Sequence, residues 1–406
     1  MIEVSKALAL VLTQALPNQP QCERVANALG MALAEDIVSD IDSPPHDKSL
    51  VDGYAVRSED ITQTGIELRI LEDVLAGDVP SQEITSGTAT RIMTGAPIPA
   101  GADAVIMVEE TGTSFEQDDP KVRINSTKVS QGQNIMRRAA SLARDERVLR
   151  RGQMLRPIEI GLLSEVGRTD VFVVPPSTVA VLATGNELVE VSRVPDAGQI
   201  RNSNGPMICA LVEKAGARAV DLGIARDTED ELNRLIAQGL EHDVLVLSGG
   251  VSAGVMDLVP SVLSKLGVEQ VFHRVNLKPG KPLWFGVLRD PQRIKLVFGL
   301  PGNPVSSLVC FELFVRAALL ALSGRVLDDF LPESARLACE HSQRGARPTY
   351  WPSRLEGEGR NRLVEPLDWQ GSADLRSLVE ANCLAFFPGG DKLYGVGCEV
   401  RIHPLQ

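Results

Sequence analysis

Loops rich in glycine and proline, with lysines among them, are the part of the sequence best suited to chemistry. Ser248-Gly249-Gly250 and Leu300-Pro301-Gly302-Asn303-Pro304 each follow a short apolar run, and Lys278-Pro279-Gly280-Lys281-Pro282 leads into another. Such runs are typical of buried strands, and open α/β sheets bind ligands in loops at strand ends. Paired glycines let backbone amides converge on an anion, and Lys278 and Lys281 add positive charge. The loops therefore predict a site for a phosphorylated or otherwise anionic small molecule.

Two further loops place carboxylates beside this predicted anion site. Thr184-Gly185-Asn186-Glu187 and Ala225-Arg226-Asp227 each follow a predicted strand, and Asp257 comes shortly after the paired glycines. Mg²⁺ binds one or two carboxylates together with substrate phosphates, so these acids are candidate metal ligands. Asp227 precedes an acidic helix start and serves equally well there as a helix cap, whereas Glu187 is not in the register of an obvious cap. Function is therefore favoured for Glu187 and stays open for Asp227.

Alternating strands and helices are predicted to position these loops. The predicted strands are Val179–Leu182, Ala219–Ile224, Val244–Leu247 and Leu296–Phe298. The predicted helices are Pro206–Ala215, Glu229–Leu240, Leu258–Leu266 and Pro304–Leu322. This alternation indicates βαβ crossovers and a mainly parallel sheet covered on both faces, with the loops on one edge.

Three other regions flank the α/β domain, which we place at residues 177–325. Residues 39–145 lack a helical period and carry short extended segments separated by turns, which indicates a β-rich insert domain. Residues 1–38 and 146–176 are predicted to form a helical and linking region, and residues 326–406 a small C-terminal β domain. Within the insert, Asp52-Gly53-Tyr54-Ala55 reads as a turn with a carboxylate. Arg91–Pro97 reads as a strand that leads into a turn.

The overall composition excludes several classes of function. The chain has 406 residues and a net charge of −12, which argues against general binding to nucleic acid or anionic membranes. The six cysteines are scattered and no H-E-x-x-H pattern occurs, so we expect reduced thiols and no zinc site. The apolar run near the N-terminus is too short for a signal peptide and predicts a helix from about Val4 to Ala15. We expect a cytoplasmic protein.

Seven segments, in this order, resemble the molybdopterin molybdenumtransferases, the MoeA and gephyrin E-domain family: DGYAVR, RIMTGAPIP, GQNI-x-RR, TGNEL, LSGGVS-x-G, KPGKP and LPGNPVS. The resemblance extends from near the N-terminus to the end of the chain. It implies an elongated homodimer of four-domain subunits with a MogA/MoaB-like α/β domain and a C-terminal domain that resembles a β-barrel. It also implies an enzyme that inserts molybdate into adenylylated molybdopterin with Mg²⁺ and releases AMP. The active site is then shared between the α/β domain and the β-rich insert of the other subunit.

The resemblance implies roles for individual residues. The acids implied to be catalytic are Glu187, Asp227, Asp257 and Asp52, of which the first three are also the implied Mg²⁺ ligands. The residues implied to bind substrate are Thr94, Thr184, Gly185, Ser248, Gly249, Gly250, Ser252, Lys278, Lys281, Pro301, Gly302, Asn303, Pro304, Arg137 and Arg138. Asp52 and Thr94 are implied to come from the partner subunit. The chemistry agrees, because molybdate is a dianion that needs cationic and amide donors.

The chain departs from the family pattern in three segments. After Arg138 the family usually has Gly-Glu-Asp, where this chain has Ala139-Ala140-Ser141. Before Asp52, Lys48-Ser49-Leu50-Val51 replaces the common Asn-Ser-Ala-Met, and Leu258 replaces a tyrosine. These changes leave open a working insertase with an altered molybdate pocket and a diverged paralogue that carries or presents molybdopterin or AMP. A pterin adenylyltransferase is a further alternative, because the resemblance implies that the core of the α/β fold is shared with that activity. The multi-domain layout and the insert segments favour the insertase, with a molybdopterin adenylyltransferase and apo-molybdoenzymes as possible partners.

Overall fold

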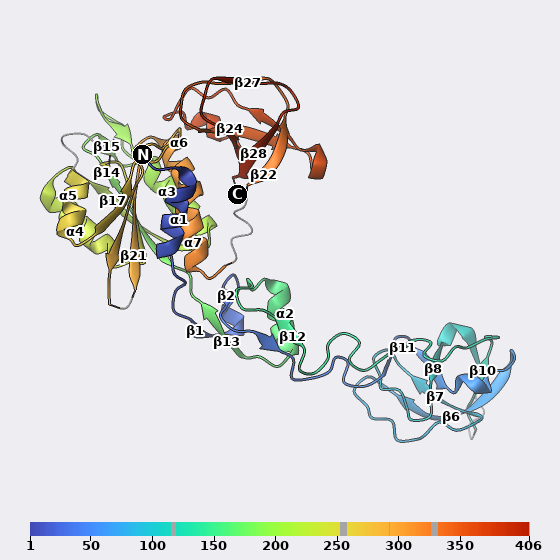
Figure 1. Cartoon of the computed structure of the whole chain (residues 1–406). Coiled ribbons are helices and arrows are strands. Elements are labelled where there is room, and N and C mark those ends of the chain that lie inside the picture. The colour runs from blue at the N-terminus through green and yellow to red at the C-terminus, as the bar shows by residue number, and fades with distance from the viewer. Residues whose placement is uncertain (115–118, 252–257, 292, 326–331, 406) are drawn as a thin grey trace. The chain divides into compact units, whose positions relative to one another are not determined.

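The computed structural model describes residues 1–114, 119–251, 258–291, 293–325 and 332–405 (Figure 1). The chain forms two compact units. The first contains Met1–Glu35, Arg151–Ile160 and Asp170–Gln406, and the second contains Asp36–Arg150 and Gly161–Thr169. The first unit carries the glycine loops, and each unit is described by itself below.

A six-stranded sheet with the order β17-β14-β18-β21-β20-β19 forms the centre of the first unit. Its strands are β14 (Thr178–Thr184), β17 (Arg218–Ala225), β18 (Val244–Ser248), β19 (Glu269–His273), β20 (Trp284–Arg289) and β21 (Ile294–Leu300). β17, β14, β18 and β21 run parallel, as the sequence predicts, and β20 and β19 are added antiparallel. The carboxyl ends of the parallel strands therefore share one edge.

Helices cover both faces of this sheet, which confirms the predicted α/β class. They are α1 (Val4–Gln14), α3 (Asn204–Lys214), α4 (Glu229–Gly239), α5 (Leu258–Lys265), α6 (Pro304–Cys310) and α7 (Arg316–Leu322). Val179 and Val181 of β14 pack in a core with α1, α3, α6 and α7, while Ala180 and Leu182 pack on the other face with α4 and α5. Because the sheet is buried on both sides, its strands are apolar runs without polar alternation.

The N-terminal helix α1 belongs to this α/β core, although the sequence-based boundaries grouped it with a linking region. Its buried Ala7 and Val11 join the same cluster as Phe314 and Leu319, and Figure 1 shows α1 beside α7. The linking region itself forms a small sheet with the order β1-β13-β2. These strands are β1 (Gln21–Arg24), β2 (Ala32–Leu33) and β13 (Asp170–Val174), and helix α2 covers Pro157–Glu165.

A π-helical turn, Phe311–Val315, joins α6 to α7 in one continuous helix. Among the described residues, Pro304–Leu322 is the one helix long and apolar enough to cross a membrane, and 89% of its apolar window is buried. It is therefore a core helix of the α/β domain, in agreement with the sequence prediction. Its buried Glu312 and Arg316 form an ion pair of 2.7 Å.

The C-terminal segment of the first unit is a closed barrel with the order β22-β25-β24-β26-β28, as the resemblance implies. Its strands are β22 (Glu333–Leu337), β24 (Thr349–Glu356), β25 (Leu363–Pro366), β26 (Cys383–Phe387) and β28 (Glu399–Pro404), with β23 (His341–Gln343) paired to β27 (Lys392–Tyr394) beside it. Leu337, Val364, Phe387 and Ile402 fill its core.

The second unit is β-rich, as predicted, and contains a six-stranded sheet with the order β8-β5-β7-β6-β10-β9. Its strands are β5 (Gly53–Val56), β6 (Ile66–Val74), β7 (Thr88–Ile92), β8 (Ala104–Met107), β9 (Thr111–Ser114) and β10 (Lys121–Ile124). Short pairs link β4 (Lys48–Ser49) with β11 (Ile135–Met136) and β3 (Ile37–Val38) with β12 (Arg147–Leu149). The first unit contains one further short pair, β15 (Leu188–Val189) with β16 (Ile200–Arg201).

Candidate functional site

The loops that follow the four parallel strands meet around one cavity of about 650 Å³, here called the strand-end cavity. The predicted residues among its lining are Thr184, Gly185, Glu187, Asp227, Ser248, Gly249, Gly250, Pro301, Gly302, Asn303 and Pro304. Its volume lies in the range of about 300–1,000 Å³ that is usual for small-molecule sites. The structure thus brings together most of the α/β residues that the sequence selected.

Gly249 and Gly250 contribute to this cavity in different ways. The Gly249 amide donates a hydrogen bond to the Leu300 carbonyl at 3.1 Å, so that amide is directed at the neighbouring strand rather than at a ligand. Gly249 has a φ of +95°, and a Cβ there would lie 2.5 Å from the Thr184 carbonyl oxygen. A Cβ on Gly250 would lie 2.7 Å from Thr184 Oγ1. Both positions therefore require glycine for the close approach of the loops, and Gly250 is the better candidate for an amide donor.

Asn204, at the start of α3, ties two of the loops together. Its Nδ2 donates to Ser248 Oγ at 2.8 Å and to the Gly302 carbonyl at 2.7 Å. The Gly302 carbonyl can only accept, which fixes the orientation of the amide. The buried Asn204 Oδ1 and Thr184 Oγ1 then have no hydrogen-bond partner within the described chain. Buried polar atoms without a partner are uncommon in folded proteins, and these two belong to residues that line the strand-end cavity.

Glu187 and Asp227, the two predicted acids that the structure describes in the α/β domain, lie exposed at the rim of this cavity. Asp227 does not cap α4, because its Oδ2 accepts from the Asn186 amide at 3.2 Å, while Asn186 Oδ1 accepts from the Asp227 amide at 3.1 Å. The capping alternative for Asp227 is therefore wrong. Glu187 folds its carboxylate over Gly185, where a Cβ would lie 2.5 Å from Glu187 Oε2. Asp257 and Ser252, which the sequence also selected, lie outside the described residues.

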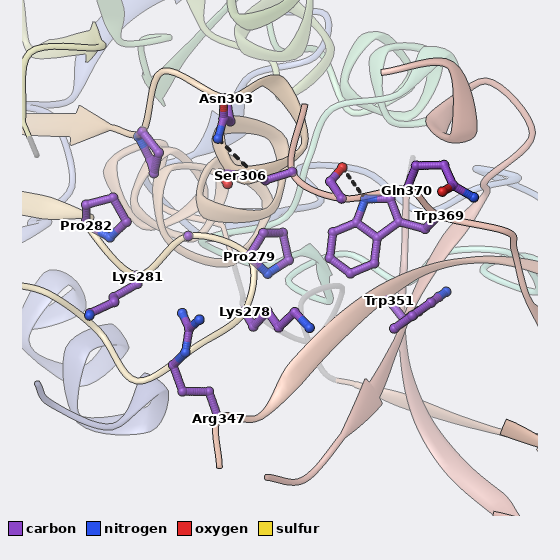
Figure 2. A pocket seen from close by; sticks show the side chains of 14 residues that line it. Lys278, Pro279, Lys281, Pro282, Asn303, Ser306, Arg347, Trp351, Trp369 and Gln370 are labelled. Atoms are coloured by element: carbon purple, nitrogen blue, oxygen red, sulfur yellow. Dashed lines mark hydrogen bonds between the residues drawn. The ribbon is translucent and has the colours of Figure 1, made fainter. Parts of the chain in front are cut away.

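The two lysines of the KPGKP loop line a second cavity of about 440 Å³, here called the cation cavity (Figure 2). Arg347, from the segment before β24, adds a third positive charge to its wall. The described residues that line it include no aspartate or glutamate. Lys278, Lys281 and Arg347 therefore form a site of concentrated positive charge on a chain whose net charge is −12. Such a site selects an anion.

Hydrogen bonds between the α/β domain and the barrel build the cation cavity. The Lys278 amide donates to the Pro348 carbonyl, and the Tyr350 amide donates to the Lys278 carbonyl, both at 2.8 Å. Arg347 Nη1 donates to the Leu277 carbonyl at 3.1 Å, which orients its guanidinium. On another wall, Asn303 Nδ2 donates to Ser372 Oγ at 2.8 Å.

The strand-end cavity and the cation cavity adjoin, because Pro282, Pro301 and Asn303 line both. The site predicted as one pocket is therefore two compartments: Gly250 lies in the first and Lys281 in the second. An elongated anionic ligand can extend through both compartments.

In the second unit, the predicted site residues engage one another or nearby acids. Asp52 Oδ1 accepts hydrogen bonds from the amide and the hydroxyl of Thr94, each at 2.7 Å, and these bonds hold the pKa of Asp52 below its ordinary value. Arg137 pairs with Asp47 at 2.6 Å, and Arg138 pairs with Asp42 at 2.5 Å. The arginines are thus partly neutralised, which weakens the expectation that they bind substrate directly.

Sequence reasoning missed several residues that line the two cavities. They are Asn204 and Arg201 in the first, and Arg347, Trp351, Trp369 and Ser372 in the second. The cation cavity was hard to foresee because Lys281 belongs to the α/β domain and Arg347 to the C-terminal barrel region, so the two are far apart in the sequence. The available signal was the dipeptide Arg347-Pro348, which alone is too short to be specific.

The chain matches three family descriptions in succession. Residues 2–167 match the MoeA N-terminal region (domains I and II), residues 180–321 the probable molybdopterin binding domain, and residues 334–405 the MoeA C-terminal region (domain IV). These matches define a multi-domain protein whose α/β domain is similar to a probable molybdopterin binding domain.

Full-length relatives place the chain within one family. It is 32% identical to a molybdopterin molybdenumtransferase of Staphylococcus aureus over 99% of this chain and 95% of the relative. It is 34% identical to that of Haemophilus influenzae over 100% and 99%. A crystal structure of a molybdopterin biosynthesis MoeA protein from Pyrococcus horikoshii superposes with a TM-score of 0.79 at 30% identity, covering 100% of both chains. The protein belongs to the MoeA family of molybdenum cofactor biosynthesis proteins, a family of transferases.

Proposed function

We propose that this protein inserts molybdate into adenylylated molybdopterin and releases AMP. The observation that carries the proposal is the pair of adjoining cavities, one lined by glycine loops at strand ends and the other by three cations. The first suits the phosphates and nucleoside of the adenylylated substrate. The second suits the molybdate dianion, held by Lys278, Lys281 and Arg347. Water cleaves the phosphoanhydride bond, which gives AMP and leaves a phosphate on the pterin. The two thiolates of the pterin bind the molybdenum and displace one oxide of molybdate, which takes up two protons and leaves as water, so the oxidation state of the molybdenum does not change.

The chain's own residues supply binding and orientation for this reaction. Gly250 lines the strand-end cavity and is the proposed amide donor to a phosphate, while Asn204 Nδ2 holds Ser248 and the Gly302 carbonyl in place around it. Arg347 and the lysines neutralise the charge on molybdate, and the Leu277 carbonyl keeps the guanidinium in place. Preorganised donors of this kind lower the cost of bringing two anions together.

The strand-end cavity also has a donor set that fits Mg²⁺. Glu187 and Asp227 present exposed carboxylates beside the place of the phosphates, which matches the use of one or two carboxylates plus phosphate oxygens. Within the described part of the chain, no group of three His, Cys, Asp or Glu residues forms a complete metal site. The ion therefore needs oxygen atoms from the substrate or from water. When bound, Mg²⁺ neutralises charge that develops on the phosphoanhydride.

The central experiment is a turnover assay with purified full-length protein, adenylylated molybdopterin, molybdate and Mg²⁺. We expect AMP release that requires molybdate, together with activation of an apo-molybdoenzyme by the product. Tight binding of the substrate without AMP release indicates the carrier alternative and contradicts the proposal. Formation of adenylylated molybdopterin from ATP indicates the adenylyltransferase alternative.

We further propose a homodimer in which Asp52 and Thr94 of one subunit complete the site of the other. The test mixes two inactive variants, Asp52→Ala and Lys281→Ala, under conditions that exchange subunits. If the site is shared, mixed dimers contain one intact site, and activity returns to about one quarter of wild type. If each subunit forms its own site, activity does not return. Light scattering gives the mass of the assembly directly.

The proposed place of action is the cytoplasm, and the proposed partners are a molybdopterin adenylyltransferase and apo-molybdoenzymes. The family membership supports these expectations. Cell fractionation tests the first, and co-purification from cells grown with molybdate tests the second.

A further inference from the structure

Two of the chain's three tryptophans line the cation cavity. Trp351 of β24 and Trp369, which follows β25, have ring centroids 4.9 Å apart and planes at 87°. The third, Trp284, lies in the sheet core. Aromatic residues make up only 4% of the chain, so an indole pair beside three cations is an unusual concentration. Figure 2 shows both indoles beside Pro279 and Lys278.

Backbone carbonyls fix both rings in place. Trp351 Nε1 donates to the Leu367 carbonyl at 2.8 Å, and Trp369 Nε1 donates to the Gly371 carbonyl at 2.6 Å. The indole N–H groups are therefore engaged with the protein, and what each ring presents to the cavity is aromatic surface, more of it from the half-buried Trp351 than from the buried Trp369. Such surface recognises a flat ring by stacking or edge contact rather than by hydrogen bonding.

The other walls of the same cavity are suited to an anion. Lys278, Lys281 and Arg347 contribute the charge. Ser372 Oγ accepts a hydrogen bond from Asn303, which leaves the hydroxyl hydrogen free to be donated to a ligand. The cavity thus combines an aromatic side with an anion-binding side within about 440 Å³.

We propose that Trp351 and Trp369 position the pterin ring of the substrate, so that its metal-binding end lies among Lys278, Lys281 and Arg347. This inference rests on the proposed function and adds two positioning residues to it. The shared lining of Pro282, Pro301 and Asn303 lets the nucleotide end of the same molecule lie in the strand-end cavity. The adenine base and the pterin ring then occupy different compartments.

The test measures binding of 6-carboxypterin, a fluorescent anionic pterin, to the full-length protein by anisotropy and by emission intensity. We expect wild-type protein to bind the probe and quench its emission through ring contact. Trp351→Leu removes the aromatic surface and weakens binding about 10-fold or more, as loss of base–aromatic stacking does. Trp351→Phe keeps an aromatic ring, so it retains affinity to within a few-fold but quenches less. Trp369→Phe is an independent test of the other indole, and we expect it to retain affinity for the probe to within a few-fold but to quench its emission less.

Trp284→Phe is the matched control, because it also removes one indole but lies outside the cavity. It leaves both affinity and quenching as in wild type. In turnover assays, Trp351→Leu raises the KM for the pterin substrate more than it lowers kcat. Equal affinity of the probe for wild type and for Trp351→Leu overturns the inference. Displacement of the probe by AMP from wild type but not from Trp351→Leu also overturns it, because the tryptophan would then belong to the nucleotide site.

The two proposals fail separately. Molybdate-dependent AMP release by wild type without tryptophan-dependent pterin binding leaves the proposed function intact and removes this inference. Tryptophan-dependent pterin binding without AMP release supports this inference and removes the proposed function.

Discussion

Thr94 donates two hydrogen bonds to one carboxylate oxygen of Asp52, one from its amide and one from its hydroxyl, each at 2.7 Å. The pair joins the turn before β5 to the turn after β7. The other oxygen of Asp52 keeps its capacity to accept, and the carboxylate stays ionised at lower pH than an isolated aspartate. Asp52 therefore combines a structural contact with an exposed charge.

We predict that Thr94→Val lowers the stability of the β-rich unit by about 0.5–1.5 kcal/mol, the usual net value of one hydrogen bond. Thr94→Ser keeps the hydroxyl and remains near wild type. Urea denaturation of the two variants measures the difference. Equal stability of both variants would show that the hydroxyl bond contributes nothing.

Gly249→Ala is expected to destabilise the α/β domain by about 1–3 kcal/mol, because φ is +95° and the new Cβ meets the Thr184 carbonyl. Gly302→Ala is the matched control in the same cavity, since its Cβ finds only Gly249 Cα at 3.8 Å. Denaturation curves give the stabilities, and calorimetry with AMP gives the affinity. A Gly249→Ala protein as stable as Gly302→Ala contradicts the steric argument.

Arg347→Ala is expected to raise the KM for molybdate about 10-fold or more, as loss of a hydrogen bond to a charged group does. Arg347→Lys keeps the charge but loses the bond to the Leu277 carbonyl, so it recovers only part of the effect. Arg344→Ala removes the same charge from a nearby exposed position that does not line the cavity. A similar rise in the KM for molybdate in Arg344→Ala would show that the effect of Arg347 is long-range electrostatic attraction and not direct binding. High salt would then abolish the rise in both variants.

His403 on β28 makes the stability of the first unit depend on pH. Burial, together with Arg316 and Arg401, lowers the pKa of His403 from 6.5 to about 4, and Tyr350 packs against its ring at 5.4 Å. Between pH 6.5 and pH 4, His403 is therefore protonated in the unfolded chain but neutral in the folded chain. This term lowers stability as pH falls from 6.5 towards 4, by up to about 2 kcal/mol at pH 5.

The matching variant is His403→Phe, which cannot titrate. Its free energy of unfolding is expected to fall less than that of wild type between pH 7.5 and pH 5. Parallel pH dependence in the two proteins rules out a contribution from His403.

Ser141→Asp restores an acid that the family resemblance leads us to expect. Ser141 is exposed in a turn where its amide donates to the Ser43 carbonyl at 2.9 Å, so the longer side chain has room. We expect a higher rate of molybdate-dependent AMP release. Ala143→Asp, two residues later, also exposed and outside the Gly-Glu-Asp segment, controls for charge alone. An unchanged rate in Ser141→Asp means that this position does not limit catalysis.

The sequence predicted the site residues that lie in loops at strand ends. It missed the site residues that come from segments distant in the sequence. The runs before Gly185 and Gly249 are apolar because their strands are buried on both faces, and parallel strands place such loops on one edge. β19 was missed because its half-exposed residues lack an apolar run. Trp369 and Arg347 reach the site only through the docking of the barrel, which no local pattern encodes.

The pairing of the Lys278 loop with the start of β24 makes the barrel part of the wall of the cation cavity. A chimaera that receives this barrel from a relative also exchanges Arg347, both tryptophans and Ser372, all of which line that cavity. If molybdate binds there as proposed, we expect substitutions after residue 340 to alter the selectivity between molybdate and tungstate, with every glycine loop of the sheet untouched.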